Sequence, residues 1–248
     1  MKDSAEASEF YVPTLGLSVE PYIAAENKQG VHHIGRYQWA CTVLQQRQSR
    51  RILDIACGAG YGSFMLASAM PQAEVIGADY DARAIDYAKA TYAKNNLHFT
   101  RGDMALWSDG QRALGEFDAI VSFDTIEHLL HREIAFMRIT ENLSDDGVLL
   151  LSTPCGRRTY NNLLPGWEHH KIEYGYPDLY RVLARFFHLV LAPRHPQYPA
   201  PEVWEQINRN RLRYYNRMNP LVCERPIKVL VPNYATQWEE PNDGIKPR

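Results

Sequence analysis

The sequence predicts an α/β fold in which a doubly wound, mostly parallel sheet carries helices on both faces. Short apolar segments alternate along the chain with longer amphipathic ones, which is the order of strands and helices in a parallel sheet. A glycine-rich turn, "CGAGYG", follows the first apolar segment and opens an amphipathic one, as at the first strand–helix turn of such sheets.

The elements follow from this alternation in chain order. Residues 1–30 have weak periodicity and are expected to form a partly ordered arm, and residues 31–48 show the spacing of an amphipathic helix. The predicted strands are then 51–56, 73–79, 97–103, 117–123 and 147–154, and the predicted helices 61–70, 82–96 and 132–143. Beyond Pro154 the predicted elements are helix 177–187, strand 188–192, helix 201–218 and an edge strand 227–232.

This order predicts four parts of the chain. They are an N-terminal arm with a lid helix (1–48), an α/β core (49–193), a helical cap insertion (194–225), and a final strand with a tail (226–248). The C-terminal third of the chain is rich in aromatic residues, which would suit a lid over a pocket for a sugar or a flat small molecule, but most of them are expected to form the core of a small cap subdomain.

Composition excludes several classes of protein. The net charge of −2 produces no field that would draw the chain to nucleic acid or an anionic membrane. No stretch is apolar enough for a signal peptide or a transmembrane helix. The four cysteines are scattered without a CxxC pair, so reduced thiols and a cytoplasmic location are expected.

The glycine-rich turn carries acidic residues in an informative order. Gly58 and Gly60 allow a ligand to approach the backbone closely, but nucleotide oxidoreductases also have such a loop. Asp54 precedes the glycines, where its charge would repel a pyrophosphate. Asp79 and Asp103 end the next two strands, placed to accept hydrogen bonds from a ribose and an adenine. A cationic nucleoside ligand therefore fits better than a dinucleotide.

Five segments resemble, in order, the motifs of class I S-adenosylmethionine-dependent methyltransferases, which have a Rossmann-like fold. They are "LDIACGAG", "GADYD", "RGDM", "FDAIVSFDTIEHL" and "LSDDGVLLLSTP", over roughly residues 50–155. Ala56 stands where the family usually has a small residue or glycine. The resemblance implies S-adenosylmethionine contacts at Asp54 and Gly58 (methionine part), Asp79 (ribose), Asp103 and Met104 (adenine), and further cofactor contacts at Ala56, Tyr80 and Phe123.

The arm carries a second resemblance. "HHIGRYQWA" is similar to an N-terminal helix that covers the cofactor in many bacterial methyltransferases, with His33, Arg36 and Tyr37 on one face. The resemblance implies cofactor contacts from Arg36 and Tyr37, with Arg36 pairing the cofactor's carboxylate. The alternative is a surface helix with solvated charges.

"FDTIEHLL" places Asp124, Glu127 and His128 at i, i+3 and i+4, which share one face of a helix. Three interpretations remain open: a solvated helix start with Asp124 as its cap, a base at His128 that deprotonates a hydroxyl, or a metal site. For the metal site, "WEHHKIEY" offers His169 or His170 as a second imidazole.

The pattern acid-x-x-Glu-His followed by His-Lys-apolar-Glu resembles metal-dependent 2′-O-methyltransferases of small-RNA 3′ ends. Ubiquinone-pathway O-methyltransferases share its first half. The resemblance implies that Asp124, Glu127, His128 and His170 bind Mg²⁺ or Mn²⁺, with His128 and His170 as catalytic residues. Asp124 is shorter than the acid usual at that position, and no RNA-binding extension is evident.

The function expected from the sequence is O-methylation of a small molecule, such as a sugar or a diol-bearing natural product. There are two alternatives: an RNA 2′-O-methyltransferase, and a metal-free N- or O-methyltransferase with His128 as base. A non-catalytic S-adenosylmethionine-binding protein fits the sequence less well. An NAD-linked oxidoreductase is disfavoured by Asp54. The expected partners are a small-molecule substrate and, in a homodimer, a second copy of the chain. Neither nucleic acid nor membrane is expected.

Overall fold

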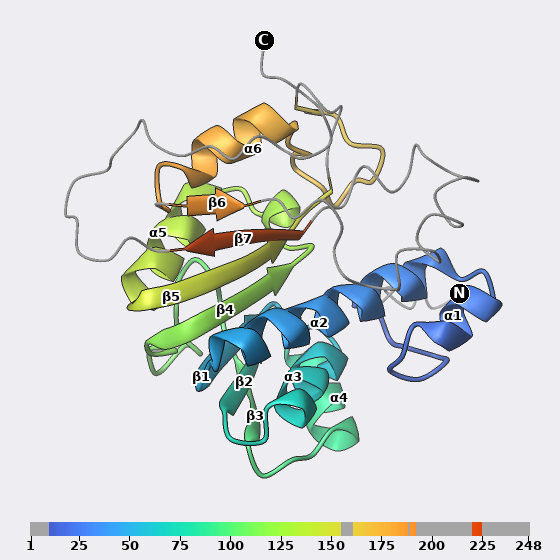
Figure 1. The fold of residues 1–248 in the computed structure, drawn as a ribbon. Coiled ribbons are helices and arrows are strands. Elements are labelled where there is room, and N and C mark those ends of the chain that lie inside the picture. The colour runs from blue at the N-terminus through green and yellow to red at the C-terminus, as the bar shows by residue number, and fades with distance from the viewer. Residues whose placement is uncertain (1–9, 155–160, 188, 192–219, 225–248) are drawn as a thin grey trace, which may run out of the picture.

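A computed structural model describes residues 10–154, 161–187, 189–191 and 220–224 (Figure 1). Its helices are α1 (Glu20–Ala24), α2 (Lys28–Arg47), α3 (Tyr61–Ala69), α4 (Ala82–Thr91), a 3₁₀ turn η1 (Ile126–His128), α5 (Arg132–Asn142) and α6 (Tyr176–Leu183). Its strands are β1 (Arg51–Ile55), β2 (Glu74–Asp79), β3 (Leu97–Arg101), β4 (Phe117–Phe123), β5 (Leu143–Ser152), β6 (Leu189–Leu191) and β7 (Pro220–Glu224).

The strands form one sheet in the order β3-β2-β1-β4-β5-β7-β6. Strands β1 to β5 pair in parallel, and β7 runs antiparallel to both of its neighbours. The strand order reverses between β1 and β4, and ligands of such sheets bind beside the carboxyl ends of the strands at that point. The predicted doubly wound, mostly parallel fold is confirmed.

Helices cover both faces of the sheet because successive strand residues point to opposite sides. Ile52 packs on the α2–α3 side and its neighbour Leu53 on the α5–α6 side, and both are fully buried. In Figure 1, α2 crosses in front of the sheet and α5 lies behind β5. The strands need apolar residues on both faces, which is why they are visible in the sequence as continuous apolar runs.

Helix α2 joins the arm to the core. The side chain of Asn27 caps its first turn by accepting a hydrogen bond from the backbone N–H of Gly30 at 3.0 Å. Gly30 is required here because a Cβ would lie 1.9 Å from the ring of Tyr22, which packs α1 against α2. The helix ends at Arg47, and the next residue, Gln48, caps it in a left-handed conformation. Its middle turns are buried, so α2 belongs to the core as well as to the arm.

The C-terminal part differs from the expected elements at one place. The strand that enters the sheet between β5 and β6 is Pro220–Glu224, inside the range assigned to the helical cap insertion. The predicted helix 201–218 and strand 227–232 lie outside the described residues, and the four-part division of the chain stays a prediction.

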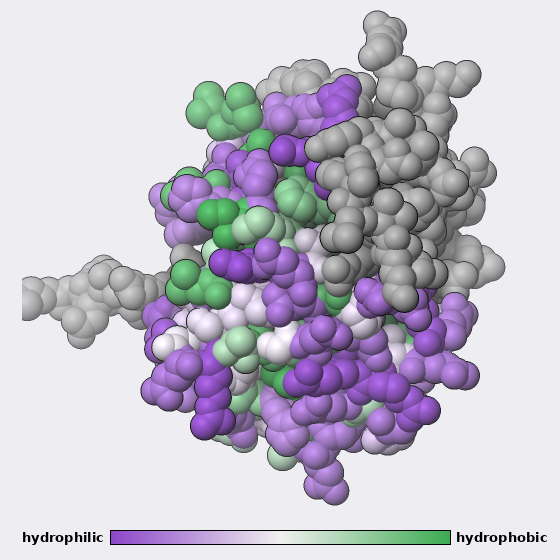
Figure 2. All heavy atoms as spheres, turned by 90° about the vertical axis from the view of Figure 1, so that its left-hand side faces the viewer, coloured by the Kyte–Doolittle hydropathy of each residue, from purple (hydrophilic) through white to green (hydrophobic). Residues whose placement is uncertain are grey.

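Figure 2 shows the face that lies on the left of Figure 1. Hydrophilic side chains cover most of its coloured area, and hydrophobic ones form separate small patches between them. None of the helices in the described part of the chain has the length and apolar composition that a membrane crossing needs.

Candidate active site

The glycine-rich turn and the end of β2 are joined by one carboxylate. Asp79 accepts hydrogen bonds from the backbone N–H of Gly58 at 2.8 Å and of Asp81 at 2.9 Å. Only 7% of Asp79 is exposed. Its carboxylate therefore lies beside the N-terminus of α3, where a ribose would find an acceptor next to backbone donors.

Two positions of this turn have left-handed backbone conformations that matter. Gly60 has φ +80°, and a Cβ there would lie 2.6 Å from Cβ of Ala88 and 2.8 Å from the ring of Phe99. Ala56 has φ +63°, which costs an L-residue roughly 1–2 kcal/mol relative to glycine. Ala56, where the sequence departs from the family pattern, is thus a strained position. Gly60, where a side chain would not fit, is retained.

The residues expected around an adenine line the ends of β2 and β3. Asp103 accepts from the backbone N–H of Ala105 at 2.7 Å and of Leu106 at 2.9 Å, which turns the chain sharply after β3. Met104 is buried and Tyr80 is 59% exposed. Tyr80 thus has an accessible ring at the edge where the ribose and adenine are expected, and these contacts stay predictions.

Asp54 lies fully buried at the end of β1. It accepts hydrogen bonds from Oγ of Ser63 at 2.6 Å and from the hydroxyl of Tyr37 at 3.0 Å. Burial raises the pKa of Asp54 to about 7, although these two hydrogen bonds act in the opposite direction. Asp54 therefore ties α2 and α3 to the sheet beneath the glycine-rich turn, and its expected contact with the methionine part stays a prediction.

This buried acid predicts a pH dependence of stability. The folded-state pKa of about 7 lies above the ordinary value of 3.8, so the folded state binds the proton more tightly. The stabilising contribution of Asp54 is then complete below about pH 4 and is lost as the pH rises through about 7. Asp54→Asn cannot titrate. The melting temperature of the natural protein, measured relative to that of Asp54→Asn, should fall steadily between those pH values; parallel curves would contradict the assignment.

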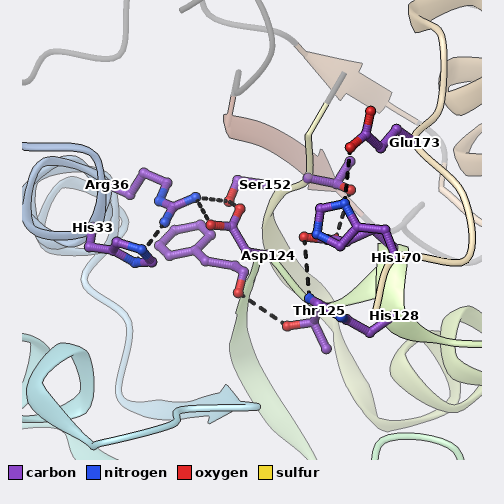
Figure 3. Close-up of polar contacts among 11 residues, drawn as sticks. His33, Arg36, Asp124, Thr125, His128, Ser152, His170 and Glu173 are labelled. Carbon is purple, nitrogen blue, oxygen red and sulfur yellow. Dashed lines mark hydrogen bonds and ion pairs between the residues drawn. The ribbon is translucent and has the colours of Figure 1, made fainter. Parts of the chain in front are cut away.

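Arg36 forms the centre of a second buried network (Figure 3). Only 1% of it is exposed, and its guanidinium forms an ion pair with Asp124 and donates to Oγ of Ser152 at 3.2 Å. It also donates to Nδ1 of His33 at 3.0 Å. Burial, and secondarily the charge of Arg36, lowers the pKa of His33 to about 3, so the ring is neutral and accepts. Here Arg36 meets a carboxylate of the protein, whereas the sequence led us to expect the cofactor's.

The N-terminal arm lies over the glycine-rich turn. Cβ of Phe10 would be 3.2 Å from a Cβ placed on Gly58, and its ring packs near Tyr87 with centroids 6.3 Å apart. Tyr11 stacks on His33 with ring centroids 4.2 Å apart. The contact at Gly58 places the arm beside the expected methionine site, which agrees with the predicted lid, although closure over the cofactor stays a prediction.

Three predicted metal ligands come together after β4. Glu127, His128 and His170 each offer a ligand atom within 4.8 Å of the others, and the rings of His128 and His170 have centroids 4.9 Å apart (Figure 3). Glu127 is fully buried, and its Oε1 has no hydrogen-bond partner. Burial, and then the charge of Asp124, raises the pKa of Glu127 well above its ordinary value. A buried carboxyl oxygen without a partner, next to two imidazoles, fits a cation.

Backbone hydrogen bonds hold the two halves of this cluster together. The backbone N–H of Lys171 donates to the carbonyl of Glu127 at 2.7 Å, so the loop that carries His170 is fixed to η1. His169 lies apart from the cluster; its Nε2 is 3.7 Å from a carboxylate oxygen of Glu168. The structure thus distinguishes the two neighbouring histidines, between which the sequence could not choose from spacing alone.

Asp124 does not join the cluster. It precedes η1 with φ +51°, so it does not share a helical face with Glu127 and His128, and its side chain caps no helix. Burial raises the pKa of Asp124, but the charge of Arg36, together with the smaller effects of His33 and of the hydrogen bonds from Arg36 and Ser152, outweighs this and the net shift is downward. Figure 3 shows Asp124 directed toward Arg36, with His128 and His170 on the other side of the end of β4. The structure therefore groups three of the four expected ligands.

Sequence reasoning missed several residues that position this site. Ser63 and Thr153 donate to the carboxylates of Asp54 and Glu127, and no local pattern distinguishes such hydroxyls. Glu173 was visible in the His-Lys-apolar-Glu pattern, but its part in the site was not identified. Its Oε1 lies 3.0 Å from Nδ1 of His170.

Phe123 and Tyr37 link the two ends of the site. Their rings meet edge to face with centroids 5.1 Å apart, and Tyr37 in turn binds Asp54. Because β1 and β4 are neighbours at the point where the strand order reverses, the glycine-rich turn and the cluster after β4 open on the same edge of the sheet.

Known proteins are similar to this chain over its α/β core. A family model described as a methyltransferase domain matches residues 46–188. A probable S-adenosylmethionine-dependent methyltransferase of Mycolicibacterium smegmatis is 28% identical over 155 residues, which cover 62% of this chain and 56% of that protein. A malonyl-acyl-carrier-protein O-methyltransferase of Bacillus cytotoxicus is 26% identical over 162 residues, or 63% and 52% of the two chains. The match thus spans about half the length of these relatives.

A solved structure extends the comparison to the fold. The plantazolicin methyltransferase, in complex with a triazolic desmethylPZN analogue and SAH, superposes with a TM-score of 0.59 over 82% of this chain and 90% of that one. The two sequences are 13% identical. This similarity shows a shared fold.

Proposed function

Because this chain belongs to the class I S-adenosylmethionine-dependent methyltransferases, we propose that it transfers the methyl group of S-adenosylmethionine to a hydroxyl of a small molecule, assisted by a divalent cation. The observation that carries this proposal is the meeting of Glu127, His128 and His170 at the sheet edge where the glycine-rich turn also opens. The O-methyltransferase named among the relatives supports oxygen as the acceptor atom.

The reaction itself demands mainly alignment. The acceptor oxygen forms a bond to the methyl carbon as the carbon–sulfur bond breaks, the electron pair of that bond stays on sulfur, and the hydroxyl proton is released. The turn after β1, with Asp79, would hold the donor, and the buried residues Tyr37 and Phe123 would exclude water near it. With the cation bound, His128 would be one of its ligands and the proton would leave to water. In the metal-free alternative, His128, which is half-buried beside Glu127, would receive the proton.

The ligand set narrows the choice of cation. With Asp124 held by Arg36, the cluster offers one carboxylate and two imidazoles, and imidazole suits Mn²⁺ or a later transition metal better than Mg²⁺. Such a cation, when bound, would lower the pKa of an acceptor hydroxyl and fix its position. Three protein ligands leave coordination positions for two acceptor oxygens, which favours a vicinal diol of a sugar or a catechol-like natural product.

The experiment that tests this function follows labelled methyl groups. The protein is incubated with S-[methyl-³H]adenosylmethionine, Mn²⁺ and paired acceptors that differ by one hydroxyl, such as catechol and phenol. Label is expected as a methyl ether on the diol, with much less on its monohydroxy partner. Label on an amine, or on the 3′ end of a small RNA, would contradict the proposed acceptor and support one of the two alternative methyltransferase activities.

A further inference from the structure

His170 is held from behind by a carboxylate. Its Nδ1 lies 3.0 Å from Oε1 of Glu173, and the two side chains are 8% and 14% exposed. A carboxylate oxygen accepts hydrogen bonds, so Nδ1 carries the hydrogen, and in the neutral ring Nε2 then has the lone pair. The tautomer of His170 is thus set by Glu173, in the orientation that a nitrogen ligand requires.

Glu173 is in turn fixed in place. The side-chain amide of Asn162 donates to Oε2 of Glu173 at 3.1 Å. The backbones of the two residues also exchange hydrogen bonds of 2.7 and 3.0 Å, which close the loop that carries His170. Both oxygens of Glu173 therefore have partners on the loop, and the carboxylate has little freedom to leave His170.

Glu127 shows the same arrangement. Its Oε2 accepts from Oγ1 of Thr153 at 2.8 Å, whereas Oε1 is buried without a partner and lies 3.9 Å from Nε2 of His128. In both Glu127 and His170, one polar atom has a hydrogen-bond partner elsewhere in the protein, and the other, without a hydrogen-bond partner among the described residues, faces the cluster. This division of atoms fixes the orientation of each side chain and leaves one of its atoms available to a ligand.

We propose that Glu173 is a positioning residue for the cluster: it holds His170 so that Nε2, together with Glu127 and His128, binds the divalent cation. The proposal rests on the proposed function, which supplies the cation. Glu173 touches neither donor nor acceptor in this scheme and acts only through His170.

The test measures cation binding directly and without turnover. The full chain is titrated with Co²⁺, whose visible absorption reports nitrogen ligation, and with Mn²⁺ followed by electron paramagnetic resonance. Glu173→Gln keeps the size of the side chain but removes its charge, and it should weaken binding of either ion by about 10- to 100-fold. Glu168→Gln is the matched control. It removes an exposed acid beside His169 on the same loop, and it should leave affinity unchanged.

A double-mutant cycle separates positioning from mere support of the loop. If Glu173 acts through His170, then Glu173→Gln should cause no further loss of affinity in a His170→Ala background, and a retained loss would overturn the proposal. A Co²⁺ spectrum and a Co²⁺ affinity that are unchanged in the single variant Glu173→Gln would also overturn the proposal. If the natural protein binds neither ion, cation assistance fails and this inference fails with it. Binding by the natural protein that is unaffected by Glu173→Gln would remove this inference alone.

Discussion

Chelation of divalent cations with EDTA is expected to abolish methyl transfer while leaving the affinity for S-adenosylmethionine nearly unchanged. The physical reason is the separation of the two binding regions: the donor contacts are expected around the turn after β1 and at Asp79, whereas the cation ligands follow β4. Adding Mn²⁺ back should restore turnover. Turnover is measured with labelled donor, and donor affinity by calorimetry on the same EDTA-treated sample.

His170 and His169 form a matched pair for this prediction. His170→Ala should raise the Mn²⁺ concentration needed for half-maximal turnover, by about 10-fold or more, since it removes a ligand. His169→Ala removes the neighbouring imidazole, which lies outside the cluster, and should leave the required Mn²⁺ concentration unchanged. Turnover that survives EDTA would reject the cation and favour His128 as a plain base, with activity that falls as the pH drops through the ordinary histidine pKa of about 6.5.

Replacing Asp79 with alanine is expected to weaken binding of S-adenosylmethionine by about 10- to 150-fold. This range corresponds to the ~1.5–3 kcal/mol typical of a hydrogen bond to a charged group. Asp79 is nearly buried and ends β2, and its carboxylate is the acceptor expected for the ribose hydroxyls. Calorimetric titration with S-adenosylmethionine and with its demethylated product measures the change, and both ligands should be affected alike because both contain the ribose.

Asp86→Ala is the control for this variant, because Asp86 is exposed on α4, the helix that follows Asp79. Its affinity for the donor should equal that of the natural protein. Asp79 also accepts from the backbone N–H of Gly58, so Asp79→Asn, which retains an acceptor oxygen, should lose less affinity than Asp79→Ala. Equal donor affinity in Asp79→Ala and the natural protein would remove Asp79 from the cofactor site.

Much of the fold could be predicted because its information is local. Strands buried on both faces need continuous apolar runs, and helices beside them need an apolar stripe, so each element is encoded by neighbouring residues. The strand at Pro220–Glu224 was not predicted, since a segment of five residues has too little periodicity to stand out. At the site, Gly58, Asp79 and Asp103 could be predicted for the same reason: each lies at or shortly after the end of a strand, and parallel strands end at one edge.

By itself, the sequence determined the order of the strands and helices, the family, and the residue types available at the carboxyl edge of the sheet. Only the tertiary structure decided which of those residues meet. It pairs Asp124 with Arg36, 88 positions away in the chain. It also places His170, and not His169, in the cluster, because the loop that carries both is fixed to the carbonyl of Glu127. The physical reason is that ion pairs and backbone hydrogen bonds between distant segments depend on where the folded chain places them, and no periodicity within one segment encodes that position.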